Sequence, residues 1–349
     1  MTLDARTWTA PALPDLDQDA AAKLRRLIDG KAKPLGALGR LEELAVQLGA
    51  IQATTAPRAE RATILLFAGD HGMVEDGVSA YPQAVTAAMV STILDGRASI
   101  NAFARTVGAE VRVIDAGVAA DLPNHPNLQN AKVRPGTRSA VREPAMTAEE
   151  CIQALSAGAE AANRAIIDGA EIIALGEMGI GNTAAASLLL HRLGPAPLED
   201  CIGLGAGHDE KGLAGKHRAL AAAVARWPGY GPFEVLRQFG GLEIAGMAGA
   251  ALAAAAARRP VVVDGFISSA AILAAVRMQP DLLPYCIFAH GSAEKGHRLM
   301  LERLGARPLL DLGMRLGEGT GAALALPILK SAAAMVRDVA SLAEVLGQA

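Results

Sequence analysis

The chain has 349 residues, of which 51% are hydrophobic, 20% charged and only 3% aromatic, and its net charge is −3. This length suits one large domain with a smaller satellite, or two domains, around a sizeable core of Ala, Leu, Val and Ile. The composition argues against disorder, and the near-neutral charge argues against nucleic-acid binding, which needs a basic face.

The cysteines and the apolar runs indicate the cellular compartment of the protein. Cys151, Cys201 and Cys286 lie far apart, each in or beside an apolar run, so buried inert thiols are expected rather than a disulfide framework or a zinc site. The first residues show no apolar signal region. The longest uncharged apolar run, Ile244–Ala257, is shorter than the ~20 residues of a membrane-spanning helix. The sequence therefore predicts a cytoplasmic protein with no membrane partner.

The first part of the chain predicts helices that stand apart from any sheet. Between residues 17 and 52, apolar residues recur at helical spacing, and Lys31–Gly36 interrupts them with proline and glycine. No strand pattern precedes these helices. We therefore expect them to form a small helical unit outside the main sheet.

A repeating pattern begins after these helices and continues towards the end of the chain. A short, mostly apolar run ends in glycine plus a polar group, and helical sequence leads to the next such run. Apolar strands with helical crossovers predict an α/β fold with a Rossmann-like parallel sheet and helices on both faces. The expected strands occupy residues 63–68, 111–114, 171–175, 261–263, 286–289 and 309–312.

The polar residues that follow these strands indicate where a ligand binds. Because the crossovers share one hand, the carboxyl ends of the strands meet at one edge of the sheet, where open α/β sheets bind their ligands. The residues expected at that edge are Asp70, His71, Asp115, Glu177, Asp264, His290 and Glu318.

Local signals predict several connecting helices and one long loop. Thr147–Glu150 has the form of a capping box and begins a helix expected to run to about Ile167. Further helices are expected at residues 209–227 and 242–257, and the small residues of the second allow close packing against a neighbour. The prolines and asparagines of Leu122–Pro144 predict a long loop.

The stretch Leu316–Gly321 places a glutamate between glycines, where an apolar run gives way to a helix expected at residues 322–335. Flanking glycines let the backbone turn sharply and let a ligand approach closely. Glu318 is therefore a candidate catalytic carboxylate. A plain alternative is an acidic residue favoured near a helix start by the helix dipole.

Two glycine-rich turns are candidates for binding a phosphate. Gly176–Thr183 connects a strand to a helix, but it has neither the lysine of a P-loop nor the Gly-x-Gly-x-x-Gly spacing of a dinucleotide site. Gly203–Lys211 opens another helix, with Lys211 and Lys216 in its first turns, where a bound phosphate would offset their unfavourable position. For both turns, ligand binding and a purely structural role stay open.

The segment Gly69–Gly72 contains Asp70 and His71, which are residue types found in metal and acid–base sites. A metal needs several convergent ligands, and the seven histidines form no close ligand pair. We therefore expect a structural or ligand-orienting role for Asp70 and His71, and we expect no metal and no cofactor.

Several segments together resemble one family, the nicotinate-nucleotide–dimethylbenzimidazole phosphoribosyltransferases of the lower-ligand branch of cobalamin synthesis. They occur in the order found in that family and span nearly the whole chain, so the ordered set is very specific. The segments are Lys33–Glu42, Phe67–Gly72, Gly77–Gln83, Ala174–Thr183, Gly240–Gly246, Asp264–Ser268, His290–Glu294 and Leu316–Gly321.

The resemblance implies a large α/β domain at residues 56–321 and a small helical domain built from residues 1–55 and about 322–349. It also implies a homodimer with the active site near the subunit contact. The implied reaction transfers the phosphoribosyl group of nicotinate mononucleotide to 5,6-dimethylbenzimidazole, with inversion at C1′. The products are α-ribazole 5′-phosphate and nicotinate.

By the same likeness, Glu318 is the catalytic base, Glu177 lies near the ribose and Lys216 binds the phosphate. The predicted nucleotide site as a whole comprises Gly176, Glu177, Gly179, Gly181, Asn182, Gly205, Lys216, Asp264, Gly317 and Gly319. The predicted aromatic-base site comprises Ser79, Tyr81, Gln83, Met178 and Leu316.

The implied chemistry requires one carboxylate in particular. As a benzimidazole nitrogen attacks C1′, the proton on its other nitrogen must leave, and a carboxylate within hydrogen-bond reach accepts it. A non-catalytic nucleotide-binding or sensor protein on the same fold is the alternative, because it would need no Glu318. An NAD-linked oxidoreductase is disfavoured, because the sequence lacks the dinucleotide fingerprint.

Overall fold

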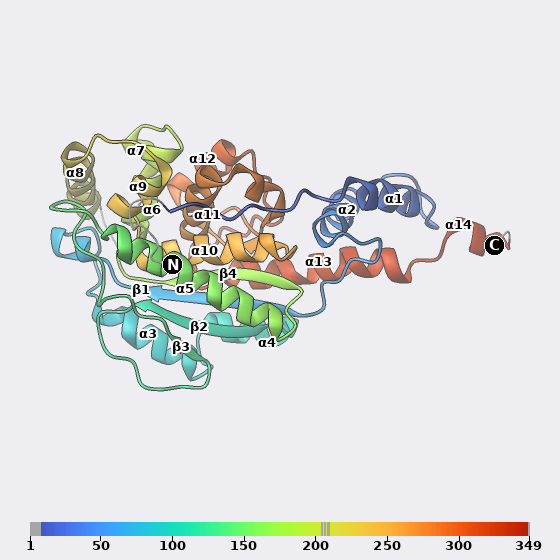
Figure 1. Ribbon diagram of the computed structural model, residues 1–349, viewed down its shortest axis with the longest axis horizontal. Coiled ribbons are helices and arrows are strands. Elements are labelled where there is room, and N and C mark those ends of the chain that lie inside the picture. The colour runs from blue at the N-terminus through green and yellow to red at the C-terminus, as the bar shows by residue number, and fades with distance from the viewer. Residues whose placement is uncertain (1–7, 204, 206, 208–209, 348–349) are drawn as a thin grey trace.

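The computed structural model describes residues 8–203, 205, 207 and 210–347 and shows a layered α/β fold (Figure 1). Within these residues, six strands form one parallel sheet in the order β3-β2-β1-β4-β5-β6, which is the strand order of Rossmann folds. The predicted fold class is confirmed. The strands are β1 (Ala62–Gly69), β2 (Glu110–Gly117), β3 (Leu128–Asn130), β4 (Ile172–Met178), β5 (Val261–Val263) and β6 (Cys286–Phe288).

Two parts of the sheet differ from the prediction. Residues 309–312 form no strand, because Leu310 makes a single bridge to His290 and the chain then turns away at Gly313, where φ is 64°. The edge strand β3 lies inside Leu122–Pro144, which the sequence predicts as a loop. Pairing with β2 over three residues overrides the local proline and asparagine signals there.

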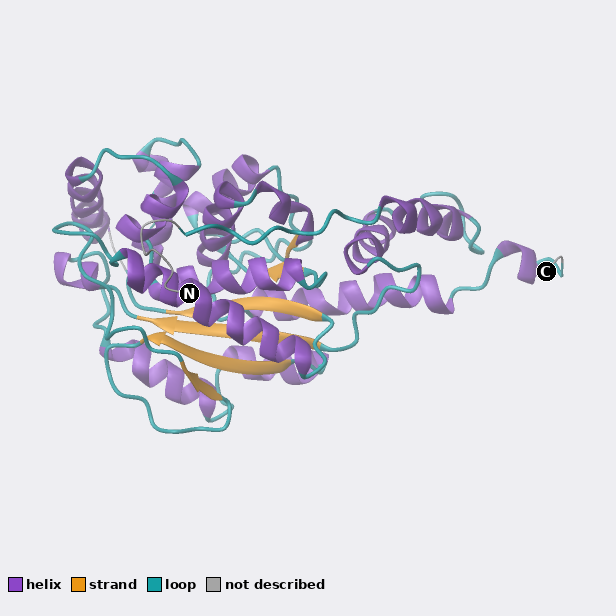
Figure 2. Cartoon of the chain, in the orientation of Figure 1, coloured by secondary structure: helices purple, strands orange, loops and turns teal. Residues whose placement is uncertain are grey.

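The sheet is buried on both faces because successive side chains of a strand point to opposite sides. In β1, Leu65 and Phe67 join one buried cluster, whereas Ile64 and Leu66 join the other. Helices α5, α6, α10 and α11 cover the first face and α3, α4 and α13 the second, so the strands lie between helices (Figure 2).

The α-helices between residues 84 and 304 are α3 (Ala84–Leu94), α4 (Ser99–Val107), α5 (Ala148–Ile167), α6 (Asn182–Leu193), α7 (Leu198–Cys201), α8 (Glu210–Arg226), α9 (Pro232–Phe239), α10 (Leu242–Ala256), α11 (Phe266–Met278) and α12 (Lys295–Leu304). Short 3-10 helices occur at η1 (Gly72–Asp76) and η2 (Pro280–Tyr285). The chain ends contribute α1 (Gln18–Asp29), α2 (Arg40–Gln52), α13 (Thr320–Asp338) and α14 (Leu342–Val345).

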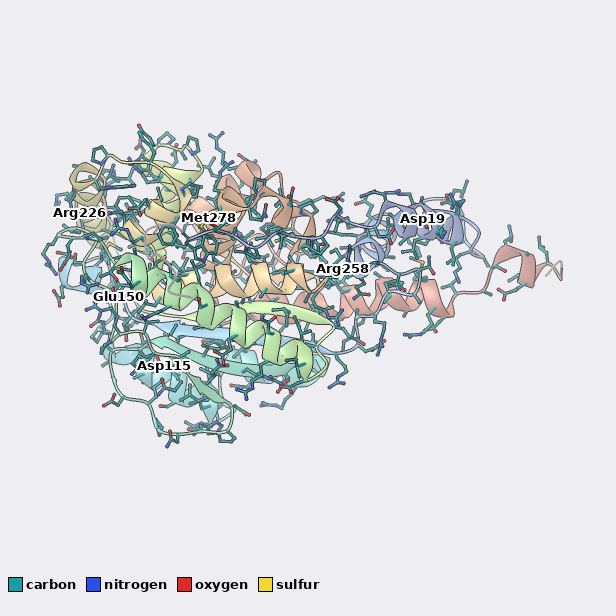
Figure 3. All side chains as sticks on the ribbon, viewed as in Figure 1. Asp19, Asp115, Glu150, Arg226, Arg258 and Met278 are labelled. Atoms are coloured by element: carbon teal, nitrogen blue, oxygen red, sulfur yellow. The ribbon has the colours of Figure 1, made fainter. Side chains whose placement is uncertain are left out.

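The helices predicted from local signals are present. Thr147 Oγ1 accepts a hydrogen bond from the Glu150 N–H at 3.1 Å, and the Glu150 carboxylate accepts one from the Thr147 N–H at 2.8 Å, at the start of α5. Figure 3 labels the Glu150 side chain. The helices expected at residues 209–227, 242–257 and 322–335 correspond to α8, α10 and α13. Asp209, the first residue of one of these predictions, lies outside the described residues.

The three cysteines are buried and form no disulfide, as expected from the sequence. Burial raises the pKa of each thiol, so Cys151, Cys201 and Cys286 stay protonated at neutral pH. Among the described residues, no helix combines the length and the apolar character that crossing a membrane requires.

Helices α5 and α10 pack so closely that glycine is required where they touch. A Cβ atom at Gly158 would overlap the main-chain carbonyl of Gly246, and one at Gly249 would overlap that of Leu155. The small residues of α10 therefore allow the close packing that the sequence predicts.

Gly158→Ala should destabilise the protein, because the added methyl group would force α5 and α10 apart. Overpacking of this kind costs typically about 1–3 kcal/mol. The free energy of unfolding, measured by urea denaturation, should fall by an amount in this range. Gly215→Ala is the control, because a Cβ there meets only the Arg218 side chain, at 3.9 Å. Equal stability of the two variants would contradict the close-packing account.

The helices at the two chain ends lie together, to one side of the sheet. Helices α1 and α2 pack on each other and beside α13 (Figure 1). The Ala32 N–H donates to the Ala340 carbonyl at 2.9 Å, and the Leu342 N–H donates to the Gly30 carbonyl at 2.8 Å. Helix α13 also contacts α4 and β4, so it connects this region to the sheet. The domain division at residues 55 and 322 stays a prediction.

Candidate active site

The carboxyl edge of the sheet holds a cavity of about 390 Å³. Its walls come from the ends of β4, β5 and β6, from the start of α3 and from the turn before α13. The polar residues expected at this edge separate into those that line the cavity, namely Glu177, His290 and Glu318, and those that do not, namely Asp70, His71, Asp115 and Asp264.

Glu318 occupies a strained backbone position at the start of α13. Gly317, Glu318 and Gly319 have φ values of 86°, 62° and 82°, so the chain is left-handed over three successive residues. A residue with a side chain adopts this conformation only where its surroundings enforce it. The carboxylate of Asp264 accepts from the N–H groups of Gly319 at 3.2 Å and Ala322 at 2.8 Å. Asp264 therefore caps α13 and holds the turn that carries Glu318.

The Glu318 carboxylate is buried and incompletely hydrogen-bonded. The residue is 4% exposed, and its Oε2 atom has no hydrogen-bond partner within the described part of the chain. Burial raises the pKa of Glu318, and the backbone of Ile100 at the start of α4 opposes this shift. A carboxylate with a raised pKa and a free oxygen is suited to accept a proton from a molecule in the cavity.

Glu177 lines the same cavity and is held by two neighbouring turns. Asn182 donates to its carboxylate through Nδ2, and the Glu318 N–H donates to its main-chain carbonyl at 3.2 Å. A Cβ atom at Gly317 would overlap the Glu177 carboxylate, so glycine is required there. Burial, with a smaller contribution from Asp264, raises the pKa of Glu177 to about 8. The side chain is therefore mostly protonated at pH 7 and both donates and accepts hydrogen bonds.

Lys216 brings the two glycine-rich turns together. Its Nζ atom donates to Thr183 Oγ1 at 2.9 Å, at the start of α6, and to the Gly203 carbonyl at 3.2 Å. The residue is 1% exposed, and burial lowers the pKa of its ammonium group to about 8. Gly205 lies beside it with φ at 61°. A buried cation beside a helix N-terminus suits an anion such as phosphate. The Lys211 side chain lies outside the described residues.

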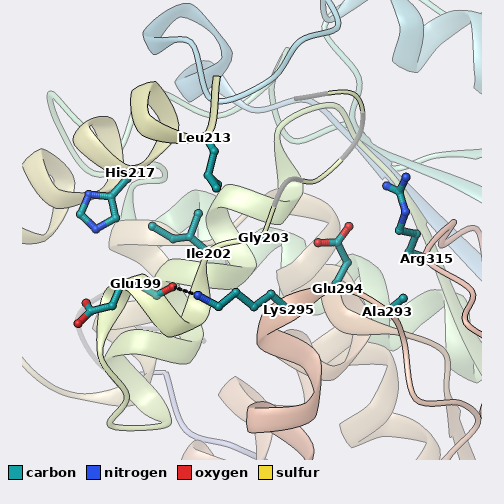
Figure 4. Close-up of a pocket in the computed structure, with 9 residues that line it drawn as sticks. All are labelled: Glu199, Ile202, Gly203, Leu213, His217, Ala293, Glu294, Lys295 and Arg315. Carbon is teal, nitrogen blue, oxygen red and sulfur yellow. Dashed lines mark hydrogen bonds between the residues drawn. The ribbon is translucent and has the colours of Figure 1, made fainter. Parts of the chain in front are cut away.

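A second cavity of about 550 Å³ adjoins the first and shares Glu294 and Arg315 with it (Figure 4). The Arg315 guanidinium donates to the Gly205 carbonyl at 3.1 Å, so a second cation lies near the turn that Lys216 contacts. Arg315 was not among the residues predicted for the site. Its position directly before Leu316–Gly321 is the signal that would have drawn attention to it.

One group of the predicted base-binding residues lines the cavity. Tyr81, Met178 and Leu316 do so, together with Val85 and Met89 of α3, which sequence analysis did not single out. Val85 and Met89 are four residues apart and therefore lie on one face of their helix, so helical spacing would have paired them. Tyr81, Val85, Met89, Met178 and Leu316 form an apolar wall of the cavity, to which α3 contributes Val85 and Met89.

The other two predicted base-binding residues make contacts outside the cavity. Ser79 Oγ accepts from the Tyr81 N–H at 3.1 Å, and Gln83 Nε2 donates to the His71 carbonyl at 2.9 Å. Both residues therefore shape the segment before α3 rather than line the cavity. A direct role for Ser79 or Gln83 in binding the base stays a prediction.

Comparisons with known proteins agree with this arrangement. A family model described as Phosphoribosyltransferase matches residues 13–345. A nicotinate-nucleotide–dimethylbenzimidazole phosphoribosyltransferase of Cupriavidus taiwanensis is 52% identical over 95% of this chain and 96% of its own length. The chain belongs to this family.

Other relatives bear the same name. The protein of that name from Pseudomonas aeruginosa is 46% identical over 95% of this chain and 94% of its own length. A crystal structure of the Thermus thermophilus protein superposes with a TM-score of 0.90 at 46% identity, covering 96% of this chain and 99% of that one. The predicted family, fold and enzyme class are thus confirmed, and the protein is a phosphoribosyltransferase.

In this family member, Asp70, His71 and Asp115 make contacts away from the cavity. His71 Nε2 lies 2.6 Å from Glu243 Oε1, and both side chains are fully buried. Burial opposes a charge on His71, but the Glu243 carboxylate outweighs it and raises the pKa of His71. Asp115 forms an ion pair with Lys132 at 3.3 Å. The contact with Glu243 is consistent with the structural or ligand-orienting role expected for His71, and for both Asp70 and His71 that role stays a prediction.

Proposed function

We propose that the protein transfers the phosphoribosyl group of nicotinate mononucleotide to 5,6-dimethylbenzimidazole, giving α-ribazole 5′-phosphate and nicotinate for cobalamin synthesis. The names of its relatives state these two substrates. The observation that best supports the proposal is the buried Glu318 carboxylate, whose Oε2 lacks a hydrogen-bond partner among the described residues and which shares a cavity with Glu177.

The transfer is an in-line displacement at the ribose C1′. One ring nitrogen of the benzimidazole attacks C1′ from the face opposite nicotinate. The bond from C1′ to the pyridinium nitrogen breaks, and nicotinate leaves with that electron pair and a neutral ring nitrogen. The configuration at C1′ changes from β to α. The proton on the other benzimidazole nitrogen passes to Glu318, which acts as the general base.

The surrounding residues align the two substrates. Lys216 and the start of α6 bind the phosphate, and the protonated Glu177 exchanges hydrogen bonds with a ribose hydroxyl. The apolar wall of Tyr81, Val85, Met89, Met178 and Leu316 holds the flat base. Because general-base help supplies only about 10²–10⁴-fold, this alignment has to provide much of the remaining acceleration.

The reaction is tested by mixing the purified protein with nicotinate mononucleotide and 5,6-dimethylbenzimidazole and identifying the products by mass spectrometry. α-Ribazole 5′-phosphate and nicotinate should form in equal amounts. Nucleotide binding without any product would instead favour a non-catalytic nucleotide-binding or sensor protein on the same fold.

The proposal includes a homodimer whose contact lies near the cavity. Exposed apolar side chains support it, because Tyr81 and Leu316 lie at the cavity with exposed fractions of 46% and 54%. Leu35, in the turn between α1 and α2, is 76% exposed. A second copy of the chain would cover such side chains. Sedimentation velocity should therefore give a mass twice that of the chain.

The Michaelis constant for nicotinate mononucleotide should rise as the pH passes about 8. Burial lowers the pKa of Lys216 to about 8, so the free enzyme loses this positive charge above that pH. The dianionic phosphate then loses its cationic partner. A pH profile of kcat/KM measures the effect. Nicotinate riboside, which has no phosphate, is the control, because its profile contains the deprotonation of Glu177 near pH 8 without the loss of the phosphate contact. If both substrates showed the same alkaline loss, Lys216 would not be the phosphate ligand.

A further inference from the structure

A buried chain of hydrogen bonds connects the end of β1 to the cavity wall. Asp70, directly after β1, accepts from the Ala119 N–H at 2.8 Å through Oδ2 and from the Thr86 hydroxyl at 2.6 Å through Oδ1. The Thr86 hydroxyl oxygen in turn accepts from the Ile180 N–H at 3.1 Å. Asp70 and Thr86 are 1% and 0% exposed, so water does not compete for these bonds.

The Thr86 hydroxyl sets the donor-to-acceptor direction of these hydrogen bonds. A hydroxyl has one hydrogen to donate and lone pairs with which to accept. The Ile180 N–H can only donate, so the hydroxyl oxygen accepts from it, and the hydroxyl hydrogen is directed to Asp70 Oδ1. Removing the hydroxyl would leave both a buried N–H and a buried carboxylate oxygen without this partner.

The turn that receives this bond is built for close approach. Gly181 has φ at 95°, and Gly179 lies so near the Gly69 carbonyl that a Cβ atom there would overlap it. Because the residues on both sides of Ile180 are glycines, the turn is held by the buried Ile180 side chain and by its backbone contacts. The hydrogen bond from the Ile180 N–H to the Thr86 hydroxyl is the contact that fixes this turn relative to α3.

A displaced turn would move the nucleotide contacts, because α6 begins directly after it. Asn182 donates to the Glu177 carboxylate, and Thr183 accepts from Lys216 Nζ at 2.9 Å. On the opposite side of the bond, α3 carries Val85 and Met89 of the apolar wall, and Val85 is the neighbour of Thr86 in the chain. Thr86 thus connects the nucleotide side of the cavity to the base side.

We propose that Thr86 is a positioning residue for the phosphoribosyl transfer, an inference that rests on the proposed function. Its hydroxyl passes the hydrogen bond of Asp70 on to the Ile180 N–H and so sets the nucleotide contacts of α6 relative to the base wall of α3. In-line transfer tolerates little misalignment of the reacting atoms. Loss of the hydroxyl therefore impairs catalysis beyond any effect on the fold.

The test compares three variants. Thr86→Val keeps the shape of the side chain and removes the hydroxyl, whereas Thr86→Ser keeps the hydroxyl. Ile93→Val trims another buried side chain of α3, two helical turns away, and serves as a control for destabilisation. Steady-state kinetics, thermal melting and calorimetric binding of nicotinate mononucleotide are measured for each. If Thr86→Val failed to fold, Thr86→Ala would replace it, because it removes the hydroxyl without crowding the site.

We expect Thr86→Val to lose about 10²-fold in kcat/KM, the scale on which a misplacement of about 1 Å acts, and to bind the nucleotide more weakly. Thr86→Ser should keep most of the activity, and Ile93→Val should melt earlier with normal kinetics. Normal kinetics in Thr86→Val, or an equal loss in Thr86→Ser, would overturn the inference. Wild-type turnover tests the proposed function separately, and the calorimetric arm still tests Thr86 if the acceptor is a different base.

Discussion

Glu318→Gln is expected to lose about 10²–10⁴-fold in kcat, which is the typical contribution of a general base. The amide has nearly the shape of the carboxylate, but it cannot take the proton that the benzimidazole must release. Nicotinate mononucleotide should bind with almost unchanged affinity, because its proposed contacts involve Glu177 and Lys216. The fold should be retained or stabilised, since the change removes a buried charge.

Rapid mixing with product detection gives the rate of this variant, and calorimetry gives its nucleotide affinity. Glu302→Gln is a matched control, because it removes a carboxylate from the exposed end of α12, where Glu302 pairs with Arg298. That variant should turn over normally. Near-wild-type turnover in Glu318→Gln would refute the role of Glu318 as the base, whereas a joint loss of turnover and nucleotide affinity would indicate a structural role.

Lys216→Met is expected to lower kcat/KM for nicotinate mononucleotide by about 10²–10³-fold. Removing one partner of a buried, hydrogen-bonded charge pair costs on the order of 2–5 kcal/mol, which corresponds to roughly 30-fold to 5,000-fold, and the expected loss lies inside that range. Methionine fills similar space, so the fold should survive. Burying an ammonium group is unfavourable, as the lowered pKa of Lys216 shows. Methionine removes this unfavourable contribution to the stability of the free protein.

The control removes a different cation from the same helix. Arg218 lies two residues after Lys216 in α8 and is exposed, so Arg218→Met should leave the kinetics unchanged. The reaction of nicotinate riboside should be equally slow in wild type and Lys216→Met, because this substrate carries no phosphate. A Lys216→Met enzyme with a normal Michaelis constant for the mononucleotide would mean that the phosphate binds elsewhere, with Arg315 as the next candidate.

Several site residues show why the sequence did not predict which polar side chains face the cavity. Asp264 and Gln83 have the polar groups expected of ligand contacts, yet their hydrogen bonds go to the N–H groups at the start of α13 and to the His71 carbonyl. The group that forms hydrogen bonds with a given side chain often comes from a segment far away in the sequence. Residue type and strand position therefore located the edge of the sheet where these groups lie, without showing which of them face the cavity.

The sheet shows the same division. Long apolar runs such as that of β1 carry their own signal, because burial on both faces demands continuous apolar sequence. Residues 128–130 and 309–312 have only short apolar sequences, so whether they form strands depends on the neighbouring strands with which they can pair. Residues 128–130 pair with β2 over three residues, and Leu310 makes one bridge to His290.

The sequence alone determined the parallel α/β fold, the family, the glycine-flanked Glu318 and the capping box before α5. These features depend on local periodicity, on turn chemistry and on motifs that follow one another in the chain. Only the tertiary structure decided that Glu318 is buried in a left-handed turn, that Lys216 joins two glycine turns, and that Thr86 connects Asp70 to Ile180. The physical reason is that burial, pKa shifts and hydrogen-bond partners arise from atoms that folding brings together from distant parts of the chain.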